Sequence, residues 1–466
     1  MATDTASDIG KVEEAQHLEQ NELHPISHEH QQYILERHST TALDPMPDMS
    51  DADPYNWPKQ KKIVNLLLVA FHAMMATFTA AAIQSAFVEI AIDLHVSIQR
   101  ASYLTSLVIA ILGGAPLFWR PLSDRYGRRP IFLLSLISSL IANIGCAKSP
   151  SYATMALCRA ISAFCISPAA ALGSAVVSEA FLKSERAKYI GIWAVMVTIG
   201  VPSAPFIFGF VALRVGYRWI YWILANTNGC QFVLYFFFGA ETRYIRGQLH
   251  GQHTSSTGAN HRLLFRRIDP TPMAWWDFIQ PLSLVAYPCV FIPAAAYAMT
   301  FLLANVLIAI EIPQLYVEKF HLNTQQVGLQ NLSIVIGSLI GEQVGGVASD
   351  KWMSSRCRNQ SSDGDTTVHP PEYRLWLSYS GFLLAICGMV VFLVRIGQAT
   401  DSWNITPTIG AGLAAAGNQI VTTVLITYAV DCYPKQAGSI GVFMTFVRQI
   451  WGFIGPFDDY YAGALW

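Results

Sequence analysis

"RPLSDRYGRRP", residues 120–130, carries five charged side chains between two long apolar runs. The runs are "YLTSLVIAILGGAPLFW" (103–119) and "IFLLSLISSLIANIGCA" (131–147). An apolar helix of about 20 residues crosses a hydrocarbon core of about 30 Å. The two runs therefore predict neighbouring membrane spans, and the charged stretch predicts a short loop between them.

The rest of the chain has the same character. Of its 466 residues, 53% are hydrophobic and only 13% are charged, whereas soluble proteins carry about 25% charged residues. The composition predicts an all-α polytopic membrane protein, and a net charge of −1 does not favour a nucleic acid partner. The candidate spans are 63–86, 102–120, 131–147, 152–178, 189–212, 218–239, 283–312, 325–348, 374–397, 405–429 and 437–456.

The order of these spans predicts four regions. Residues 1–60 are polar and predict a disordered cytoplasmic tail, in which His24, His28 and His30 do not by themselves predict a metal site. Residues 61–240 hold six spans, residues 241–282 form a polar cytoplasmic linker, and residues 283–466 hold five spans. Two helical bundles joined by a long linker are typical of secondary transporters.

The basic residues orient the chain. With the N-terminus in the cytosol, the cytosolic loops hold 17 Lys and Arg and the opposite loops hold six. Positive loops stay inside, so residues 120–130 are predicted to be cytosolic. The order Ser123-Asp124-Arg125-Tyr126 recurs as Ser349-Asp350-Lys351-Trp352 after the equivalent span of the second half, which indicates a weak internal repeat.

These features resemble the major facilitator superfamily, and within it the fungal drug:proton antiporters with twelve spans. The loop matches the superfamily signature at Asp124, Arg125, Gly127, Arg128 and Arg129, although Arg120 stands where the family has glycine. In the fourth span the match is an intramembrane arginine, Arg159. In the fifth span the antiporter motif matches at Gly191, Gly200, Pro205 and Gly209, with Pro202 beside it.

The resemblance implies a two-bundle fold and a gating role for the charged loop. Asp124 would face the positive N-terminal end of span 11, near residues 436–439, and act as a latch between the bundles. Asp350 would serve the same role in the second half. The alternative interpretation is that the arginines only anchor the loop in the cytosol, and that interpretation leaves Asp124 and the repeat unexplained.

Two intramembrane charges are candidates for proton coupling. Arg159 would shift a neighbouring carboxylate or attract an anion, or it would form a static structural pair, since an arginine does not release its proton. Glu342 lies within "GSLIGEQVGGVASD", where it could carry a proton, bind a cationic substrate, or only pack among glycines. Arg448 in span 11 is the candidate counter-ion of Glu342.

Other predicted sites are less specific. The glycines and prolines of the fifth span predict either an inter-bundle hinge or ordinary close packing of a kinked helix. Asn404 begins a glycosylation sequon that faces outward. Polar residues that could contact substrate in a central cavity, or form interhelical hydrogen bonds, are Gln84, Asn226, Asn305, Gln330, Asn331, Asn418, Gln419 and Arg448.

The predicted function is proton-coupled efflux of a small organic molecule (a drug, toxin or secondary metabolite) by alternating access. The alternatives are an uptake carrier for a polyamine or other small cation, and a truncated membrane protein that does not transport, because only eleven of the family's twelve spans are visible. No P-loop occurs in the sequence, so the proton gradient, without a cofactor, is the expected driving force. Enzyme activity is not expected. We expect a multi-pass monomer in the plasma membrane, with the vacuolar membrane as the alternative.

Overall fold

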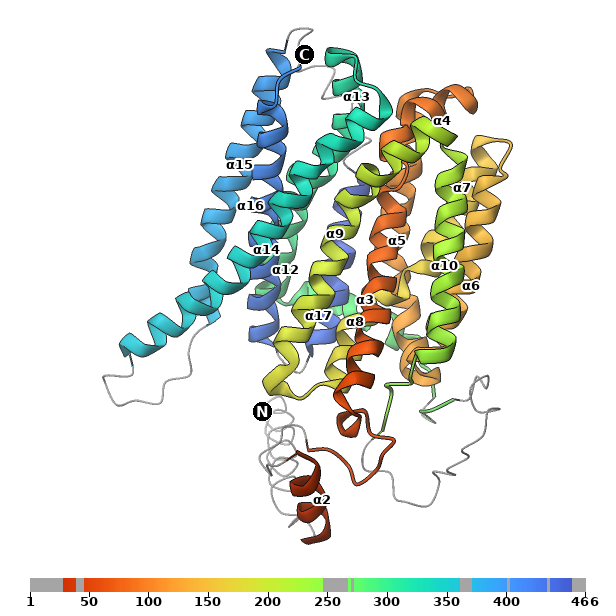
Figure 1. Ribbon diagram of the computed structural model, residues 1–466. Coiled ribbons are helices and arrows are strands. Elements are labelled where there is room, and N and C mark those ends of the chain that lie inside the picture. The colour runs from red at the N-terminus through yellow and green to blue at the C-terminus, as the bar shows by residue number, and fades with distance from the viewer. Residues whose placement is uncertain are drawn as a thin grey trace, which may run out of the picture.

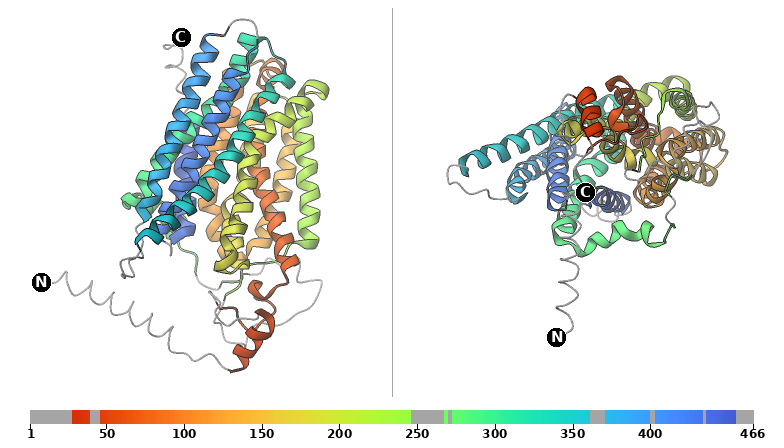
Figure 2. Two further views of the ribbon diagram at one scale, coloured as in Figure 1. Left: turned by 60° about the vertical axis from the view of Figure 1, so that its left-hand side comes forward. Right: turned by 90° about the horizontal axis from the view of Figure 1, so that it is seen from below.

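The computed structural model describes residues 28–38, 46–245, 267–269, 272–360, 371–399, 403–433 and 436–454 (Figure 1). The regular structure of these residues is helical, as the sequence predicts. Long helices run side by side along one direction, and the two halves of the chain form neighbouring groups when viewed along that direction (Figure 2). The all-α two-bundle architecture is therefore confirmed.

The first bundle follows the predicted order of spans. Its helices are α3 (Lys59–Ala81), continued by η2 (Gln84–Ala86) and α4 (Phe87–Asp93), then α5 (Ile98–Tyr126), α6 (Arg128–Ala147), α7 (Tyr152–Ile166), α8 (Pro168–Ala180), α9 (Lys183–Val215) and α10 (Arg218–Phe238). Pro168 is the first residue of α8, where it interrupts the single span predicted for residues 152–178. Proline removes a backbone donor and breaks the helical ladder there.

The second bundle is built in the same way. After the short helix α11 (Trp276–Ile279) and the turn η4 (Gln280–Ala286), its elements are α12 (Pro288–Phe301), a π-helical segment η5 (Leu302–Leu307), α13 (Ile308–Phe320), α14 (Thr324–Gln360), η7 (Pro371–Arg374), α15 (Leu375–Gly397), α16 (Thr406–Cys432) and α17 (Ala437–Ile454). Each of the eleven predicted spans is a helix or a helix with a break.

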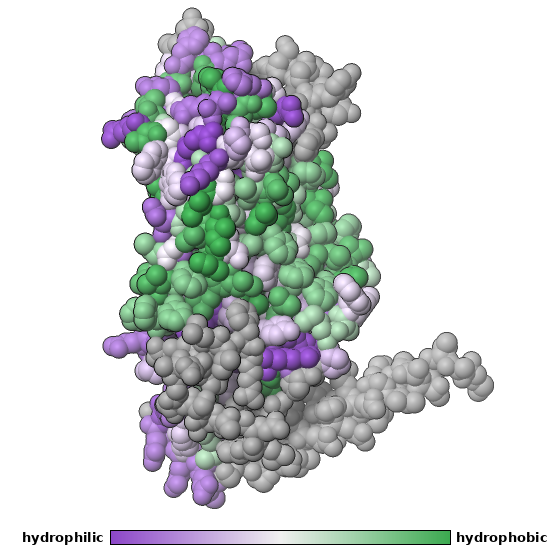
Figure 3. Space-filling model, turned by 90° about the vertical axis from the view of Figure 1, so that its right-hand side faces the viewer, coloured by the Kyte–Doolittle hydropathy of each residue, from purple (hydrophilic) through white to green (hydrophobic). Residues whose placement is uncertain are grey.

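Eight helical spans of the described residues are long and apolar enough to cross a membrane by length and composition. The helices α10 and α14 are long but are not among these eight, and Gly438–Ile454 is a shorter apolar helix. Figure 3 shows a wide hydrophobic zone on one side of the molecule, with hydrophilic residues toward both ends. Such a zone faces the lipid in a multi-pass membrane protein.

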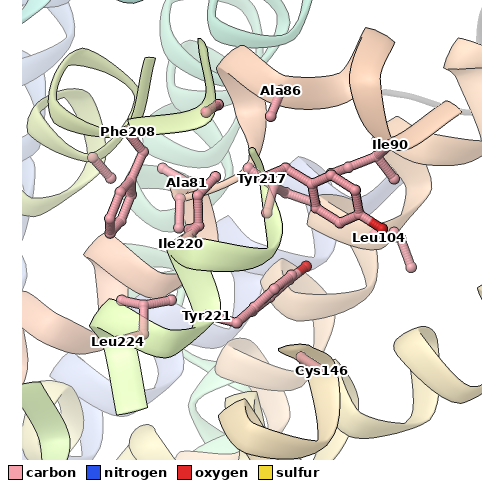
Figure 4. Close-up of a cluster of buried hydrophobic side chains, with 14 of the residues drawn as sticks. Ala81, Ala86, Ile90, Leu104, Cys146, Phe208, Tyr217, Ile220, Tyr221 and Leu224 are labelled. Atoms are coloured by element: carbon pink, nitrogen blue, oxygen red, sulfur yellow. The ribbon is translucent and has the colours of Figure 1, made fainter. Parts of the chain in front are cut away.

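The interior of the first bundle is apolar with a few polar groups. Figure 4 shows Leu104, Cys146, Ile220, Tyr221 and Leu224 packed together, and all five are fully buried. These residues come from α5, α6 and α10, so the cluster ties three helices into one bundle. Tyr221 belongs to this cluster, and its hydroxyl accepts a hydrogen bond from Arg159.

Part of the N-terminal tail is folded, which corrects the prediction of a disordered tail for residues 28–38 and 46–57. Helix α2 spans His28–His38, and Asp53 and Tyr55 are 0% and 2% exposed. The Tyr55 hydroxyl donates to the Ser178 carbonyl at 2.7 Å. The Tyr244 hydroxyl donates to Asp48 at 2.9 Å. These contacts fasten the tail to the end of the first bundle where α3 begins and α8 ends, and a polar composition alone did not reveal them.

Candidate functional site

The charged loop is a tight helix-to-helix joint. Gly127 ends α5 and begins α6 with φ of +96°, a backbone conformation that only glycine adopts without strain. The backbone N–H groups of Arg128 and Arg129 donate to the Glu241 carboxylate at 2.8 and 3.0 Å. This carboxylate caps the positive end of α6. Burial raises the pKa of the Glu241 carboxyl, while the backbone donors act to lower it.

Glu241 was not identified from the sequence, because it lies more than 110 residues from the loop it caps. The only sequence signal was its position as the first acid after the sixth span.

Arg128 forms the centre of a buried ion-pair network at this joint. Its side chain is 4% exposed, and its Nη2 lies 2.8 Å from both Asp124 and Glu179. Its Nη1 also donates to the Ser123 hydroxyl at 2.9 Å. Thr242 donates to the same Glu179 at 2.8 Å. The network joins α5, α6, α8 and the segment after α10, so it holds this end of the first bundle together.

Arg125 contacts the linker between the bundles. Its guanidinium lies 3.0 Å from Asp269 and 2.9 Å from Asp277, and its carbonyl accepts from the N–H of Ile268 at 2.8 Å. The residues of the signature therefore have different partners. Arg128 binds within the first bundle, whereas Arg125 attaches the linker to it.

The contact with the start of span 11 is made by Arg120. Its Nη1 donates to the Ser439 hydroxyl of α17 at 2.9 Å, whereas Asp124 pairs with Arg128. The expectation that Asp124 meets this helix end is therefore not met, and Arg120, the residue that departs from the family pattern, makes the hydrogen bond to it. The side chain of Asp350 lies outside the described residues, so its share in the latch stays a prediction.

We predict that a side chain at position 127 lowers the stability of the folded protein. In Gly127→Ala the new Cβ would meet the Glu241 carboxylate and Ile268, in a backbone conformation that costs about 1–3 kcal/mol for other residues. We expect a clear fall in the thermal unfolding midpoint of the purified protein. The control is Gly114→Ala in α5, where nothing lies within 4 Å of the new Cβ, and an equal fall there would contradict this reason.

Arg159 is buried in the first bundle at 2% exposure. Its guanidinium donates to the Leu104 carbonyl, the Ala80 carbonyl and the Tyr221 hydroxyl, each at 3.3 Å. Within the described residues it pairs with no carboxylate. The static ion pair considered from the sequence is therefore not what the structure shows, and Arg159 is a buried positive charge held by neutral oxygens.

A cavity of about 90 Å³ lies between the two bundles. Helices α3, α5 and α9 with η2 contribute its lining from the first half, and α12, η5, α13, α16 and α17 contribute from the second. Five of the predicted cavity residues line it, namely Gln84, Asn305, Asn418, Gln419 and Arg448. A cavity shared by both halves is the arrangement that alternating access requires.

Three other predicted cavity residues do not line it. Asn226 is exposed on α10, and its neighbour Asn228 is the buried one, donating to Ser139 at 3.0 Å. Gln330 accepts from Thr408 at 2.7 Å, and Asn331 donates to a carbonyl of its own helix. Asn226 is thus excluded as a cavity residue, and the other two make structural hydrogen bonds.

Glu342 belongs to α14, and its side chain contacts α16. Its carboxylate accepts from the Gln419 amide and, at 3.3 Å, from the Thr423 hydroxyl. The same Gln419 amide donates to Thr198 of α9 at 3.2 Å. Gln419 thus links the carboxyl to the cavity and to the other bundle. Gly337 and Gly341 pack closely, since a Cβ at either would meet the backbone of α16, whereas nothing lies within 4 Å of a Cβ at Gly346.

Arg448 is not the counter-ion of Glu342. Its Nη1 donates to the Tyr297 hydroxyl at 2.9 Å, and its guanidinium lies 4.7 Å from the centre of the Phe301 ring. A cation near an aromatic face is stabilised by the ring quadrupole. The two charges that were expected to pair therefore have separate surroundings, and only Arg448 lines the cavity directly.

The glycines of α9 have different neighbours. A Cβ at Gly209 would lie 2.9 Å from the Thr324 carbonyl oxygen and 3.1 Å from the Gly328 Cα in the other bundle. A Cβ at Gly200 would meet α3 of its own bundle, and nothing lies within 4 Å of one at Gly191. Pro202 and Pro205 lie inside the same helix. Among these three glycines, Gly209 is thus the one that contacts the other bundle, and a hinge role stays a prediction.

Asn404 precedes α16 and is exposed. Its side-chain oxygen accepts from the Thr406 N–H at 2.9 Å and the Thr406 hydroxyl at 2.7 Å. Glycosylation there stays a prediction.

Comparisons with known proteins agree with this architecture. The sequence profile of the Major Facilitator Superfamily matches residues 66–456. The MFS-type transporter atr4 of Stereocaulon alpinum is 25% identical over 418 residues, covering 86% of this chain and 72% of its own. The MFS-type transporter hepF of Aspergillus oryzae is 25% identical over 433 residues, covering 87% and 83%.

A solved structure has the same fold. It is a bacterial homologue of the human lysosomal transporter Spinster, with a TM-score of 0.59, 15% sequence identity, and coverage of 86% of this chain and 82% of that chain. At this identity the likeness concerns the fold alone.

Proposed function

This chain belongs to the major facilitator superfamily and is a membrane transporter, and on that premise we propose that it exports a small organic molecule in exchange for protons. The observation that carries the proposal is the cavity between the bundles, lined by residues of both halves. Its volume of about 90 Å³ is below the range of about 300–1,000 Å³ typical of drug-sized ligand sites. Loading such a ligand requires the bundles to move apart, as alternating access provides.

The proposed proton carrier is Glu342. A carboxyl exchanges protons readily, and this one is linked through Gln419 to the cavity and through Thr198 to the other bundle. Protonation changes what Gln419 can donate to, so it can alter an inter-bundle contact. Arg159 would contribute a fixed positive charge behind the cavity wall, at the Ala80 carbonyl. The driving force is the proton gradient rather than a bound cofactor.

Export rather than uptake is proposed from the antiporter motif of α9, where Gly191, Gly200, Pro205 and Gly209 match in register. Among the described residues that line the cavity there is no Asp or Glu, so no observation favours a carrier of cations. The proposed location is the plasma membrane, and the proposed working unit is the monomer.

The test is gradient-driven transport by the purified protein in proteoliposomes with an acidic lumen and a neutral bath. The panel is 4-hydroxybenzoate, 4-hydroxybenzamide, 4-hydroxybenzylamine and rhodamine 6G. Exchange with protons would drive at least one of them into the lumen, faster than in protein-free vesicles and not after nigericin collapses the gradient. The panel member with the largest driven uptake is called the reporter compound below. Uptake that does not depend on the gradient would disprove proton exchange.

The variant Glu342→Gln separates coupling from binding. It keeps a hydrogen-bonding side chain but cannot carry a proton, so we expect loss of gradient-driven accumulation, about tenfold or more, with substrate-for-substrate exchange retained. Both are measured as uptake of the reporter compound. The matched control is Glu318→Gln, at an exposed position of α13. Normal coupling in Glu342→Gln would remove this residue from the proton path.

A further inference from the structure

The cavity has one charged residue in its described lining, Arg448. The guanidinium is fixed by the Tyr297 hydroxyl and by the rings of Tyr297 and Phe301, whose centres lie 5.7 and 4.7 Å away. Aromatic rings stabilise a cation without neutralising it. The lining therefore presents a positive charge that the described part of the protein does not compensate, at a place where a ligand would lie.

One edge of this guanidinium is available. In the described structure Nη1 has the Tyr297 hydroxyl as its partner, whereas Nε is buried and has none. A buried donor without a partner costs free energy that a ligand can recover. The edge formed by Nε and Nη2 has the fork geometry that binds both oxygens of a carboxylate. The geometry of Arg448 thus suits a planar anion better than a spherical one.

Four further buried polar atoms in the lining lack partners in the described structure. They are Gln84 Oε1, Thr105 Oγ1, Asn418 Oδ1 and Gln449 Oε1. The four residues are 5%, 0%, 2% and 6% exposed, respectively. Buried polar atoms normally have hydrogen-bond partners, so these atoms of the lining are available to a ligand that occupies the cavity. Gln84 and Thr105 come from the first bundle, and Asn418 and Gln449 come from the second.

The remaining lining is apolar and includes Ile109 and Val306, which are 8% and 5% exposed. A ligand that satisfies the whole cavity would have an acid group for Arg448, a flat apolar body for the aromatic and aliphatic walls, and hydroxyl groups for the amides and Thr105. We propose that the cavity is the binding site for a small hydroxylated aromatic carboxylate, with Arg448 as the residue that selects the anion. This proposal rests on the transport function proposed above and names its substrate class.

The charge of such a substrate has a consequence for the driving force. Exchange of one proton inward for one monoanion outward moves positive charge inward in both steps. A membrane potential that is negative inside would then assist export in addition to the pH gradient. Export of a monovalent cation for one proton would move no net charge.

Binding is tested on the purified full chain by saturation-transfer NMR titration. The probes are 4-hydroxybenzoate, 4-hydroxybenzamide and 4-hydroxybenzylamine, which share a ring and a hydroxyl and differ in charge. We expect the carboxylate to bind at least tenfold more tightly than the amide, and the amine to bind most weakly. In Arg448→Gln the preference for the carboxylate over the amide should disappear, with amide binding unchanged. Arg448→Lys keeps the charge without the fork and should retain an intermediate preference.

The matched control is Arg395→Gln, at an exposed position of α15 outside the cavity, and it should bind all three probes as the unmodified protein does. Inorganic phosphate serves as competitor, and displacement of the carboxylate by equimolar phosphate would overturn the aromatic part of the proposal. Tighter binding of the amine, undetectable binding of the carboxylate, or an unchanged preference in Arg448→Gln would overturn the proposal as a whole.

The two proposals fail in distinguishable ways. Arg448-dependent binding of 4-hydroxybenzoate without gradient-driven movement of any panel member would support the binding site and disprove proton exchange. Gradient-driven movement of rhodamine 6G or the amine, with no Arg448-dependent carboxylate binding, would support proton exchange and disprove this substrate class.

Discussion

Arg159→Met is expected to slow uptake of the reporter compound by about 100-fold, equivalent to about 2.7 kcal/mol, while the thermal unfolding midpoint stays equal or rises. The guanidinium is buried among neutral oxygens, with its three contacts each at 3.3 Å. Burying a charge without a counter-charge is costly, so an apolar side chain of similar length relieves a cost. The protein keeps this buried charge despite its cost in stability. We infer that the electric field of the Arg159 guanidinium acts on the wall of the cavity and is needed for transport.

The measurement pairs reporter uptake with thermal unfolding in the same preparation. Arg159→Lys is the informative companion, because it keeps the charge and, with one nitrogen, cannot reproduce all three contacts, so it should retain part of the activity. Tyr221→Phe removes one contact and leaves the charge in place. If Arg159→Met lowered the unfolding midpoint strongly and lost activity only in proportion to the folded fraction, the arginine would be structural.

The architecture was predictable because hydrophobic length and loop charge act over whole segments. Each apolar run of about 20 residues is stable in lipid as a membrane-spanning helix, and the basic residues of the loops determine its orientation. The charged loop and the intramembrane Arg159 stood out for the same reason, since charge between or inside such runs is costly. These features require no knowledge of which helix faces which.

The partners of the polar residues were not predictable, because they depend on helix rotation and on contacts between distant segments. Asn226 and Asn228 are equally polar and two residues apart, yet one is exposed and the other is buried. Arg120, rather than Asp124, reaches Ser439. Glu241 caps a helix whose first residue lies 113 positions earlier in the sequence. A helix that is apolar on nearly all sides gives no periodic signal of its rotation.

Gly209→Leu is expected to reduce reporter uptake at least tenfold by holding α9 and α14 apart. Its Cβ would lie 2.9 Å from the Thr324 carbonyl oxygen and 3.1 Å from the Gly328 Cα, and neither backbone atom can turn away. Overpacking of this kind costs about 1–3 kcal/mol. A cost of about 2 kcal/mol falling on one transport state alone would lower its population about 30-fold. The bundles would then still fold but would rarely close at this end.

The change is visible as a longer distance between spin labels placed at Ile92 and Leu329, which are 70% and 39% exposed. Gly191→Leu provides the matched control, since it lies on the same helix and in the same motif with nothing within 4 Å of its Cβ. If both variants slowed uptake equally, the motif would act by bending α9 rather than by bringing the bundles together. If only Gly209→Leu did so, the motif's function would reside where α9 meets Gly328, because Gly209 approaches the backbone of the other bundle and Gly191 does not.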